Sequence, residues 1–288
     1  MKKIYTSLMV MMSLFTFGQS GTVFDDLSMT SEILGMDRKY AVYLPPDYET
    51  SQRDYPVLYL LHGAGDDQTG WVQKGEIKPI MDKALSEGKS TAMIVVMPDA
   101  QTGQRGYFNS PDGAWRYEDF FFEEFMPFIE SNYRIRAEKR YRAIAGLSMG
   151  GGGTFRYAMQ RPDLFDSACP LSASTGPVRL EDVDRYFARR GVSDASVVEK
   201  EKYFNERSVV AQIENGDVEK LRSVQWYIDC GDDDFLYEGN ALVHIAMREK
   251  EVPHEYRVRD GGHNWKYWRE SLVDVLLFIS RRFNWENN

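Results

Sequence analysis

Residues 141–159, YRAIAGLSMGGGGTFRYAM, decide how the rest of the chain is interpreted. The first five predict a short buried strand, and residues 149–159 predict a helix. Between them lies GLSMG at 146–150, a G-x-S-x-G pattern that puts Ser148 on a sharp strand-to-helix turn. Side chains on the flanking glycines would collide with neighbouring backbone. The helix N-terminus favours negative charge developing near the serine hydroxyl.

Outward from this turn, strand-like and helix-like segments alternate along the chain. Predicted strands cover 38–44, 56–61, 92–97, 167–171, 224–229 and 255–259, and further predicted helices cover 77–85, 117–133, 240–250 and 268–283. Repeated strand–helix units predict an α/β fold with a mostly parallel central sheet and helices on both faces.

One stretch breaks this alternation. Residues from about 176 to 221 are charged, mostly helical in pattern and without a strong strand. We interpret them as a helical insertion folded over the top of the sheet, above the candidate active site. Residues 21–288 are therefore predicted to form a single domain that includes this insertion.

The N-terminus has the pattern of a targeting segment. Lys2 and Lys3 precede an almost uncharged apolar run at 4–17, and the small residues GQSG follow at 18–21. This predicts a secretory signal peptide over residues 1–20, and hence a secreted or periplasmic protein. The run is too short to span a bilayer comfortably, so stable membrane insertion is not expected.

Composition limits the partners. The 288 residues are 43% hydrophobic and 27% charged, which is ordinary for a globular protein. The net charge of −9 becomes 33 − 44 = −11 once the two N-terminal lysines are removed, which disfavours nucleic acid and suits a neutral substrate such as a sugar. The four histidines and two cysteines form no zinc pattern, so no metal or cofactor is expected. Cys169 and Cys230 are expected as buried thiols in adjacent strands, with a disulfide as the less favoured alternative.

A serine hydroxyl needs a base to act as a nucleophile. His263 follows the last predicted strand in DGGHN at 260–264 and precedes the last helix, where an α/β fold of this kind places its base. The other histidines fit less well. His62 precedes the serine beside a glycine turn, His244 lies within a helix, and His254 stands at a strand start.

The base in turn needs a carboxylate that fixes its tautomer. The preceding loop reads CGDDDF at 230–235, and spacing alone leaves its three aspartates as alternatives. The chain order Ser, Asp, His is that of an α/β-hydrolase. Two backbone N–H groups are needed for an oxyanion, and we expect them from Met149 and from Ala64 in the turn after residues 56–61.

These segments together resemble the esterase D superfamily of α/β-hydrolases, and most closely the feruloyl and acetylxylan esterases of carbohydrate esterase family 1. The resemblance spans almost the whole chain after residue 20. It is carried by YLPPDY at 43–48, LLHG at 60–63, IVVMP at 94–98, RAIAGLSMGG at 142–151, CGDDD at 230–234 and GGH at 261–263.

The resemblance implies residue roles and a substrate class. In these esterases the acid is the third residue after the glycine of the Cys-Gly pair, which is Asp234 here, with Asp233 in reserve. The residue after the His-Gly pair, Ala64, supplies the second oxyanion amide. The implied reaction is hydrolysis of feruloyl or acetyl esters on plant cell-wall polysaccharides. Formylglutathione hydrolases share the superfamily, but they are cytoplasmic, which the N-terminal segment argues against.

Aromatic and imidazole side chains near the expected site are candidates for substrate binding. We assign Trp71, Trp265 and His62 to this role. Tyr107, Phe108 and Trp115 follow the strand at 92–97, and the insertion, with Tyr203 and Phe204, is expected to form one wall. Structural packing is the competing explanation for each aromatic residue.

Other functions remain open at this point. They are an esterase for a trilactone siderophore or for short-chain acyl esters, an acyltransferase that excludes water, and a non-catalytic binding protein on the same fold. The acyl group, the natural polysaccharide and the oligomeric state are left open by these residues.

Overall fold

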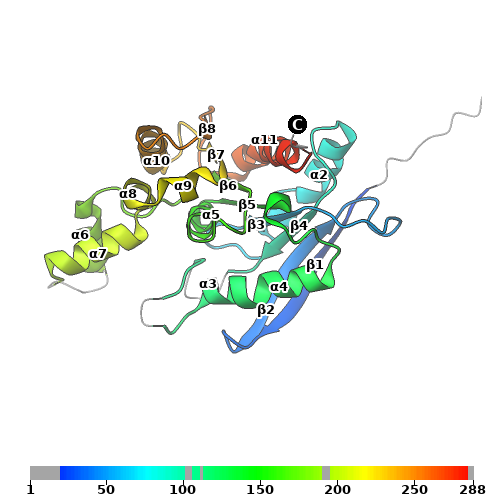
Figure 1. Cartoon of the computed structure of the whole chain (residues 1–288), viewed down its shortest axis with the longest axis horizontal. Coiled ribbons are helices and arrows are strands. Elements are labelled where there is room, and N and C mark those ends of the chain that lie inside the picture. Colours follow the sequence, from blue (N-terminus) through cyan, green and yellow to red (C-terminus); the bar gives the residue numbers. More distant parts are fainter. Residues whose placement is uncertain (1–19, 101–105, 111–112, 190–194, 285–288) are drawn as a thin grey trace, which may run out of the picture.

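The computed structural model describes residues 20–100, 106–110, 113–189 and 195–284. Nearly all of the predicted signal peptide, and residues 190–194 of the predicted insertion, lie outside these ranges. Figure 1 shows a twisted central sheet with helices packed on both sides. The strands are β1 (Thr22–Ser31), β2 (Met36–Leu44), β3 (Val57–Leu61), β4 (Ile94–Pro98), β5 (Arg142–Leu147), β6 (Ser167–Leu171), β7 (Gln225–Asp229) and β8 (His254–Arg257).

The sheet has the order β1-β2-β4-β3-β5-β6-β7-β8. Strands β3 to β8 all run parallel to one another, whereas β1 pairs with β2, and β2 with β4, in antiparallel fashion. The chain moves outward from β3 to β4 and then crosses back to β5. This reversal puts a crevice at the carboxyl ends of β3 and β5, where open α/β sheets bind ligands. The predicted α/β-hydrolase fold is confirmed.

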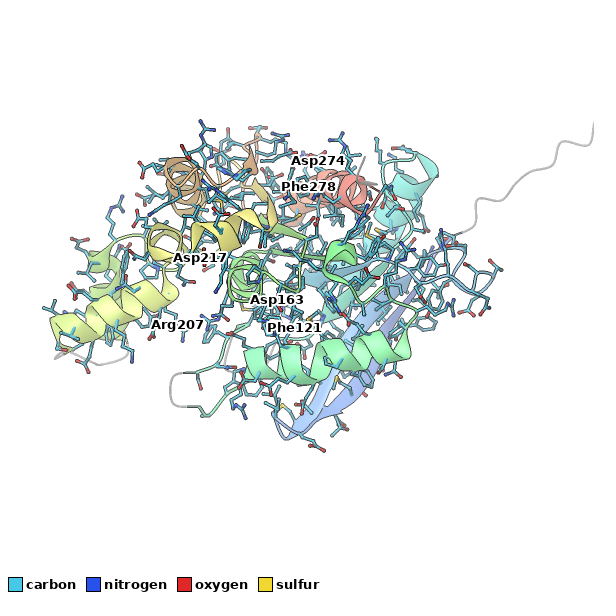
Figure 2. The ribbon with its side chains drawn as sticks, viewed as in Figure 1. Phe121, Asp163, Arg207, Asp217, Asp274 and Phe278 are labelled. Carbon is cyan, nitrogen blue, oxygen red and sulfur yellow. The ribbon has the colours of Figure 1, made fainter. Side chains whose placement is uncertain are left out.

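Alternating side chains make each central strand part of two cores. In β3, Val57, Tyr59 and Leu61 face one hydrophobic cluster, whereas Leu58 and Leu60 face the other. A strand buried on both faces reads as a continuous apolar run, which is why these strands were recognisable in the sequence. Phe121 and Phe278, labelled in Figure 2, lie on opposite sides of the sheet.

The helices divide between these two faces. Buried side chains of α1 (Gly70–Gln73), α2 (Ile77–Ser86) and α11 (Trp265–Asn284) belong to one cluster. Those of α4 (Met126–Asn132), α5 (Met149–Gln160) and α10 (Tyr237–Glu249) belong to the other. The remaining short elements are α3 (Tyr117–Asp119), the π-helical η1 (Phe120–Phe125) and the 3₁₀ turn η2 (Lys139–Tyr141). No helix among the described residues is both long enough and apolar enough to cross a bilayer.

Two local predictions differ from the structure. The helix predicted over 117–133 contains a π-helical stretch at three consecutive phenylalanines, and the rings of Phe121 and Phe125 both reach the core. The first strand, β1, was not predicted because it is an edge strand with mostly polar, partly exposed residues. Its register shifts between Phe24 and Leu27, next to two aspartates.

The predicted insertion lies between β6 and β7 and is helical, as expected. It comprises α6 (Leu180–Arg189), α7 (Val197–Arg207), α8 (Val209–Asn215) and α9 (Val218–Arg222). Side chains of α8 join the main core, whereas α6 and α7 project from one end of the molecule in Figure 1. Cys169 in β6 and Cys230, directly after the adjacent β7, are buried free thiols.

Candidate active site

Ser148 occupies a strained turn between β5 and α5. Its φ of 55° and ψ of −114° are unusual for a residue with a side chain. Hydrogen bonds on both sides hold this conformation. The Ser148 N–H donates to the carbonyl of Leu171 at 2.9 Å, and the Ser148 carbonyl accepts from the N–H groups of Gly152 at 3.0 Å and Ser174 at 2.9 Å. The turn is therefore fixed by the end of β6 as well as by its own helix.

Close backbone contacts explain the glycines around Ser148. A Cβ on Gly146 would lie 2.6 Å from the Gly150 carbonyl oxygen, and one on Gly150 would lie 2.6 Å from the carbonyl oxygens of Leu61 and His62. These distances are shorter than van der Waals contact allows, as the sequence led us to expect. A Cβ on Gly63 would meet the Leu147 side chain at 2.5 Å, so the turn after β3 packs directly against the serine turn.

The structure brings Ser148, His263 and Asp234 together from three strand ends. His263 Nε2 lies 3.0 Å from Ser148 Oγ. His263 Nδ1 lies 3.0 and 2.9 Å from the two carboxylate oxygens of Asp234. Because a carboxylate only accepts, Nδ1 carries the proton and Nε2 is free to accept the serine proton.

Of the three adjacent aspartates, only Asp234 points inward. Its carboxylate is buried, whereas Asp232 and Asp233 are exposed. The Asp234 N–H donates to the Gly231 carbonyl at 3.3 Å, which closes a turn. Asp232 instead accepts the Gly261 N–H at 3.0 Å and ties its loop to the one that carries His263. The spacing left these residues as alternatives, and this turn distinguishes them.

The surroundings of Asp234 keep its carboxylate ionised. Burial by itself raises the pKa of Asp234, but hydrogen bonds from His263, the Leu236 N–H and Ser172 outweigh it, so the pKa lies below its ordinary value. The Leu236 N–H donates at 2.8 Å. An ionised acid at this position stabilises the protonated form of His263 during a reaction.

Ser172 is a residue of the site that sequence reasoning missed. It is fully buried, has a φ of 43°, and its hydroxyl accepts the indole N–H of Trp268 at 3.0 Å while also bonding Asp234. The ring of Trp268 contacts His263 edge-on, with 4.9 Å between centroids. Ser172 directly follows β6, just as the other site residues follow their strands, and that position was the available signal.

The two predicted oxyanion donors flank the serine. Met149 is the first residue of α5, and the N–H groups of a helix's first turn have no acceptor within the helix. Ala64 follows Gly63 in the turn that packs on Leu147 and is itself exposed. Both amides thus belong to turns that meet at the crevice between β3 and β5.

Two residues assigned to substrate binding are buried, and the structure corrects that assignment. His62 is 1% exposed; its Nδ1 donates to the Gly63 carbonyl and its Nε2 accepts the Ala100 N–H, both at 2.8 Å. Burial lowers the pKa of His62, which keeps the ring neutral. Trp71 is 0% exposed and donates to the Leu61 carbonyl at 3.0 Å. Both side chains support the turn around Gly63 from inside the protein.

Trp265 reaches the site through other aromatic rings. It is half-buried and packs edge-on against Trp71, with 5.2 Å between centroids, and against Trp268, with 5.3 Å. Trp268 in turn contacts His263. Its contact with a substrate stays a prediction.

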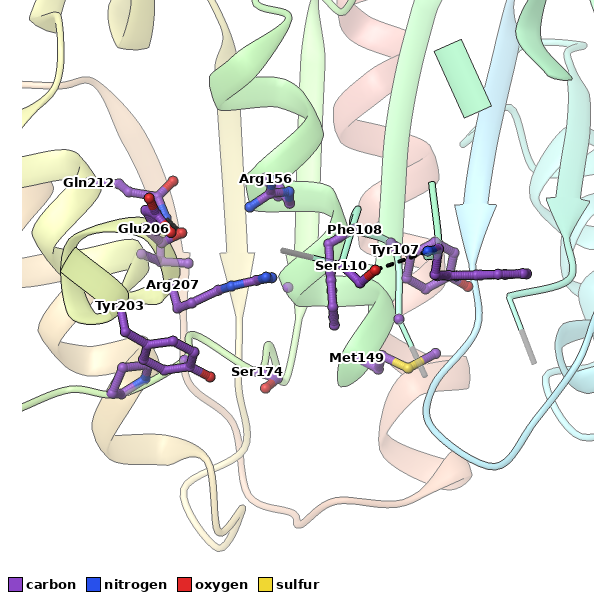
Figure 3. A pocket seen from close by; sticks show the side chains of 17 residues that line it. Tyr107, Phe108, Ser110, Met149, Arg156, Ser174, Tyr203, Glu206, Arg207 and Gln212 are labelled. Atoms are coloured by element: carbon purple, nitrogen blue, oxygen red, sulfur yellow. Dashed lines mark hydrogen bonds between the residues drawn. The ribbon is translucent and has the colours of Figure 1, made fainter. Parts of the chain in front are cut away.

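A cavity of about 380 Å³ opens at Met149, the residue after Ser148, and its described lining does not include Ser148, Asp234 or His263. Its walls come from the loop after β4, the first turns of α5, the segment after β6 and the insertion (Figure 3). They include the predicted Tyr107, Phe108, Trp115 and Tyr203, together with Met149, Gly152, Gly153, Arg156, Ser174, Glu206, Arg207, Val209 and Gln212. Phe204 is not among the described residues that line the cavity.

A contact in the cavity wall joins the insertion to the loop after β4. Arg207, the last residue of α7, places its guanidinium carbon 4.3 Å from the centroid of the Phe108 ring (Figure 3). Gly176 has a φ of +75°, and a Cβ there would overlap the Arg207 carbonyl oxygen. The α7 C-terminus is thereby held against the chain that leaves β6.

An acidic group lies outside this cavity. Asp232, Asp233 and Asp260 are exposed and can bring carboxylate oxygens within 4.8 Å of one another. Exposed acidic side chains often gather without an ion, and in the described part of the chain the hydrogen bonds of the His263 ring go to Asp234 and Ser148, not to any of these three. We therefore assign them no cofactor role.

Comparisons with known proteins identify the family to which the chain is similar. The family model described as "Putative esterase" matches residues 31–279. A solved structure titled "ferulic acid esterase" is 38% identical, with a TM-score of 0.79 over 91% of this chain and 99% of that one. "Esterase MT1326" of Mycobacterium tuberculosis is 40% identical over 151 residues, 51% of this chain and 31% of its own. "Endo-1,4-beta-xylanase/feruloyl esterase" of Xylanibacter ruminicola is 37% identical over 154 residues, 50% of this chain.

These two curated relatives are much longer than the segment that matches this chain. The aligned part of this chain spans 31% of the M. tuberculosis protein and 21% of the X. ruminicola protein. These two proteins therefore contain long regions to which the similarity does not extend.

Proposed function

Because the chain belongs to this esterase family within the α/β-hydrolases, we propose that it hydrolyses carboxylic esters through an acyl-enzyme on Ser148. The observation that carries the proposal is the continuous hydrogen-bonded path from Ser148 Oγ through His263 to Asp234. Three residues far apart in sequence meet in the orientation that nucleophilic catalysis requires. A binding protein would have no need of this alignment.

In the first half-reaction, Ser148 Oγ attacks the ester carbonyl carbon while His263 Nε2 accepts the serine proton. The carbonyl oxygen becomes an oxyanion that accepts hydrogen bonds from the N–H groups of Met149 and Ala64. The bond to the alcohol oxygen then breaks, and His263 returns the proton to that oxygen. The alcohol leaves, and the acyl group remains bound to Ser148.

In the second half-reaction, water takes the place of the alcohol. His263 Nε2 accepts a proton from the water as its oxygen attacks the acyl carbon. The second oxyanion collapses, the bond to Ser148 Oγ breaks, and His263 returns the proton to the serine. A carboxylic acid is released, and the ionised Asp234 stabilises the charged imidazole in both halves.

The cavity favours an aromatic acyl group over an acetyl group. Its volume of about 380 Å³ lies in the range of sites that enclose whole organic ligands, about 300–1,000 Å³, and is far larger than an acetyl group needs. Phe108, Tyr203 and Trp115 offer aromatic surface to a planar ring. Similarity to a ferulic acid esterase points the same way. We therefore propose feruloyl-type esters of plant cell-wall polysaccharides as substrates.

The proposed location follows from the first 20 residues. A substrate attached to an insoluble polysaccharide must be met outside the cytoplasm. The basic residues and apolar run at the N-terminus support export of the protein. Fractionation of cells that express the full chain, with detection of the protein in the periplasm or medium, tests this point.

A trapping experiment tests the chemistry. The protein is mixed with methyl ferulate, quenched in acid within the first turnover, digested and analysed by mass spectrometry. We expect a feruloyl adduct on the peptide that contains Ser148, and none in Ser148→Ala. Parallel assays with acetylated xylan and S-formylglutathione should give lower kcat/KM than methyl ferulate. A faster reaction with either would reassign the acyl group, and an adduct elsewhere would overturn the role of Ser148.

A further inference from the structure

An exposed aromatic ring lies directly beside the proposed base. Phe235 follows the buried Asp234, yet its side chain is 73% exposed. Its ring centroid is 4.4 Å from that of His263, and the two planes are inclined by 50°. One side of Phe235 therefore packs on the imidazole, while most of its surface faces solvent at the mouth of the site.

The loop does not need this ring for its shape. Backbone bonds fix the chain around Phe235, because the Leu236 N–H donates to the Asp234 carboxylate at 2.8 Å and the Tyr237 N–H to the Asp234 carbonyl at 2.9 Å. A large apolar side chain that is mostly exposed contributes little to the core. Its position suggests a ligand contact instead.

The reaction geometry determines which part of an ester would meet Phe235. In the tetrahedral intermediate, the oxygen of the leaving alcohol must lie within hydrogen-bonding reach of His263 Nε2, since that atom returns the proton. In the proposed reaction the acyl group extends from Ser148 past Met149 into the cavity, whose described lining includes none of Ser148, His263 and Phe235. The alcohol therefore leaves along the side of the site where Phe235 is exposed.

We infer that Phe235 is a specificity-determining residue that stacks on the sugar ring carrying the ester; this inference rests on the proposed function. The C–H face of a furanose or pyranose packs on an aromatic face, whereas a methyl alcohol is too small to cover it. Asp232 and Asp233 precede Phe235 in the same loop and are exposed, so the local charge is negative. This field favours a neutral sugar over a uronic acid.

The test compares two esters of the same acid. The kcat/KM for a feruloylated arabinoxylo-oligosaccharide is divided by that for methyl ferulate, in the full chain and in Phe235→Ala. We expect the ratio to fall about fivefold to tenfold, the size of one stacking contact. Phe235→Tyr should restore the ratio. Tyr237→Ala is the matched control, because Tyr237 is also exposed, at 58%, and should leave the ratio unchanged.

A second measurement does not depend on turnover of the sugar ester. An arabinoxylo-oligosaccharide without ferulate should inhibit methyl ferulate hydrolysis in the full chain and more weakly in Phe235→Ala. An unchanged selectivity ratio, or an equal loss with both esters, would overturn the inference and leave the esterase proposal standing. If the unsubstituted protein hydrolysed neither ester, the proposed function and this inference would both fail.

Discussion

The two sides of the crevice are stabilised in different ways. On the catalytic side, Ser148 and Asp234 follow the buried strands β5 and β7, and His263 follows the partly buried β8. The turns after these strands are packed so closely that several glycines have no room for a side chain. On the insertion side, α7 has no buried residue, and Val197 and Val198 are 65% and 73% exposed. The cavity is thus bounded on one side by the first turns of α5, which the core holds in place, and on the other by α7, which buries no residue.

Local interactions compensate for the missing burial in α7. Its N-terminus carries a capping box, in which the Ser196 hydroxyl accepts the Glu199 N–H and the Glu199 carboxylate accepts the Ser196 N–H at 2.8 Å. Such caps stabilise a helix by about 1 kcal/mol without fixing its position on the rest of the protein. The comparison indicates that the chemistry is held by the core, while substrate fit depends on a few contacts across the cavity.

The largest expected effect comes from removing the nucleophile. Ser148→Ala should reduce kcat by about 10⁵- to 10⁶-fold, because only the oxyanion amides and substrate binding would remain. The fold should be unchanged, since backbone bonds to Leu171, Gly152 and Ser174 hold the turn. Steady-state kinetics and circular dichroism check both points. Retained turnover would show that Ser148 is not the nucleophile.

Loss of the acid should be nearly as severe. Asp234→Asn is expected to reduce kcat by about 10³- to 10⁴-fold, because an amide can hold His263 in the wrong tautomer. Asp232→Asn is the matched control, since Asp232 is exposed and bonds only the loop backbone at Gly261. The control should lose little activity. If Asp232→Asn lost more activity than Asp234→Asn, the acid would be Asp232 and the assignment from geometry would be wrong.

Much of the catalytic side could be predicted from the sequence. Strands β3 to β6 are buried along their whole length, and the serine turn and His263 stand where an α/β sheet puts such residues. Asp234 required the resemblance to known esterases, because three neighbouring aspartates differ only in the direction that one turn gives them. The sequence therefore predicted the type and chain order of the catalytic residues, but not the direction in which each aspartate side chain points.

The errors have the same physical cause. His62 and Trp71 stand beside the predicted oxyanion turn in sequence, but their side chains point into the core and bond backbone carbonyls and amides. Ser172 was missed because a lone serine after a strand has no motif, although a φ of 43° and two side-chain partners mark it in space. Local sequence does not encode which way a loop side chain faces when long-range packing decides it.

A smaller effect is expected from removing a hydrogen bond that supports Asp234. Ser172→Ala removes one of the hydrogen bonds that lower the pKa of Asp234, so that pKa should rise. Activity requires the ionised acid together with a neutral His263, so the titration of Asp234 contributes to the acidic limb of the pH profile. The acidic limb of the kcat/KM profile should therefore move to higher pH, with a loss of about tenfold in kcat near neutrality.

Trp268→Phe provides the comparison for this change. It removes the indole N–H that Ser172 accepts but leaves the Ser172 hydroxyl available to Asp234. The acidic limb should move less than in Ser172→Ala. If both variants shifted it equally, the effect would come from general packing around His263 and not from the bond to Asp234.

The smallest effect is expected on the insertion side. Arg207→Met removes the guanidinium that lies 4.3 Å from the Phe108 ring centroid but keeps a long apolar stem in the cavity wall. A cation–π contact at a partly exposed site is worth about 0.5–1 kcal/mol, so KM for a feruloyl ester should rise about threefold to fivefold. kcat should change little, because the serine, the histidine and the acid are positioned by other elements.

Arg185→Met is the control for loss of charge on the insertion, since Arg185 lies on α6 with its side chain 75% exposed and bonds Asp182. Its KM should match that of the unsubstituted protein. A fall in kcat of tenfold or more in Arg207→Met would mean that α7 also determines the geometry at Ser148, and the two walls would then be mechanically coupled. A change confined to KM would indicate that the core positions the catalytic residues and that the insertion contributes to substrate fit, because the Arg207–Phe108 contact lies in the cavity wall and does not reach the hydrogen bonds of the triad.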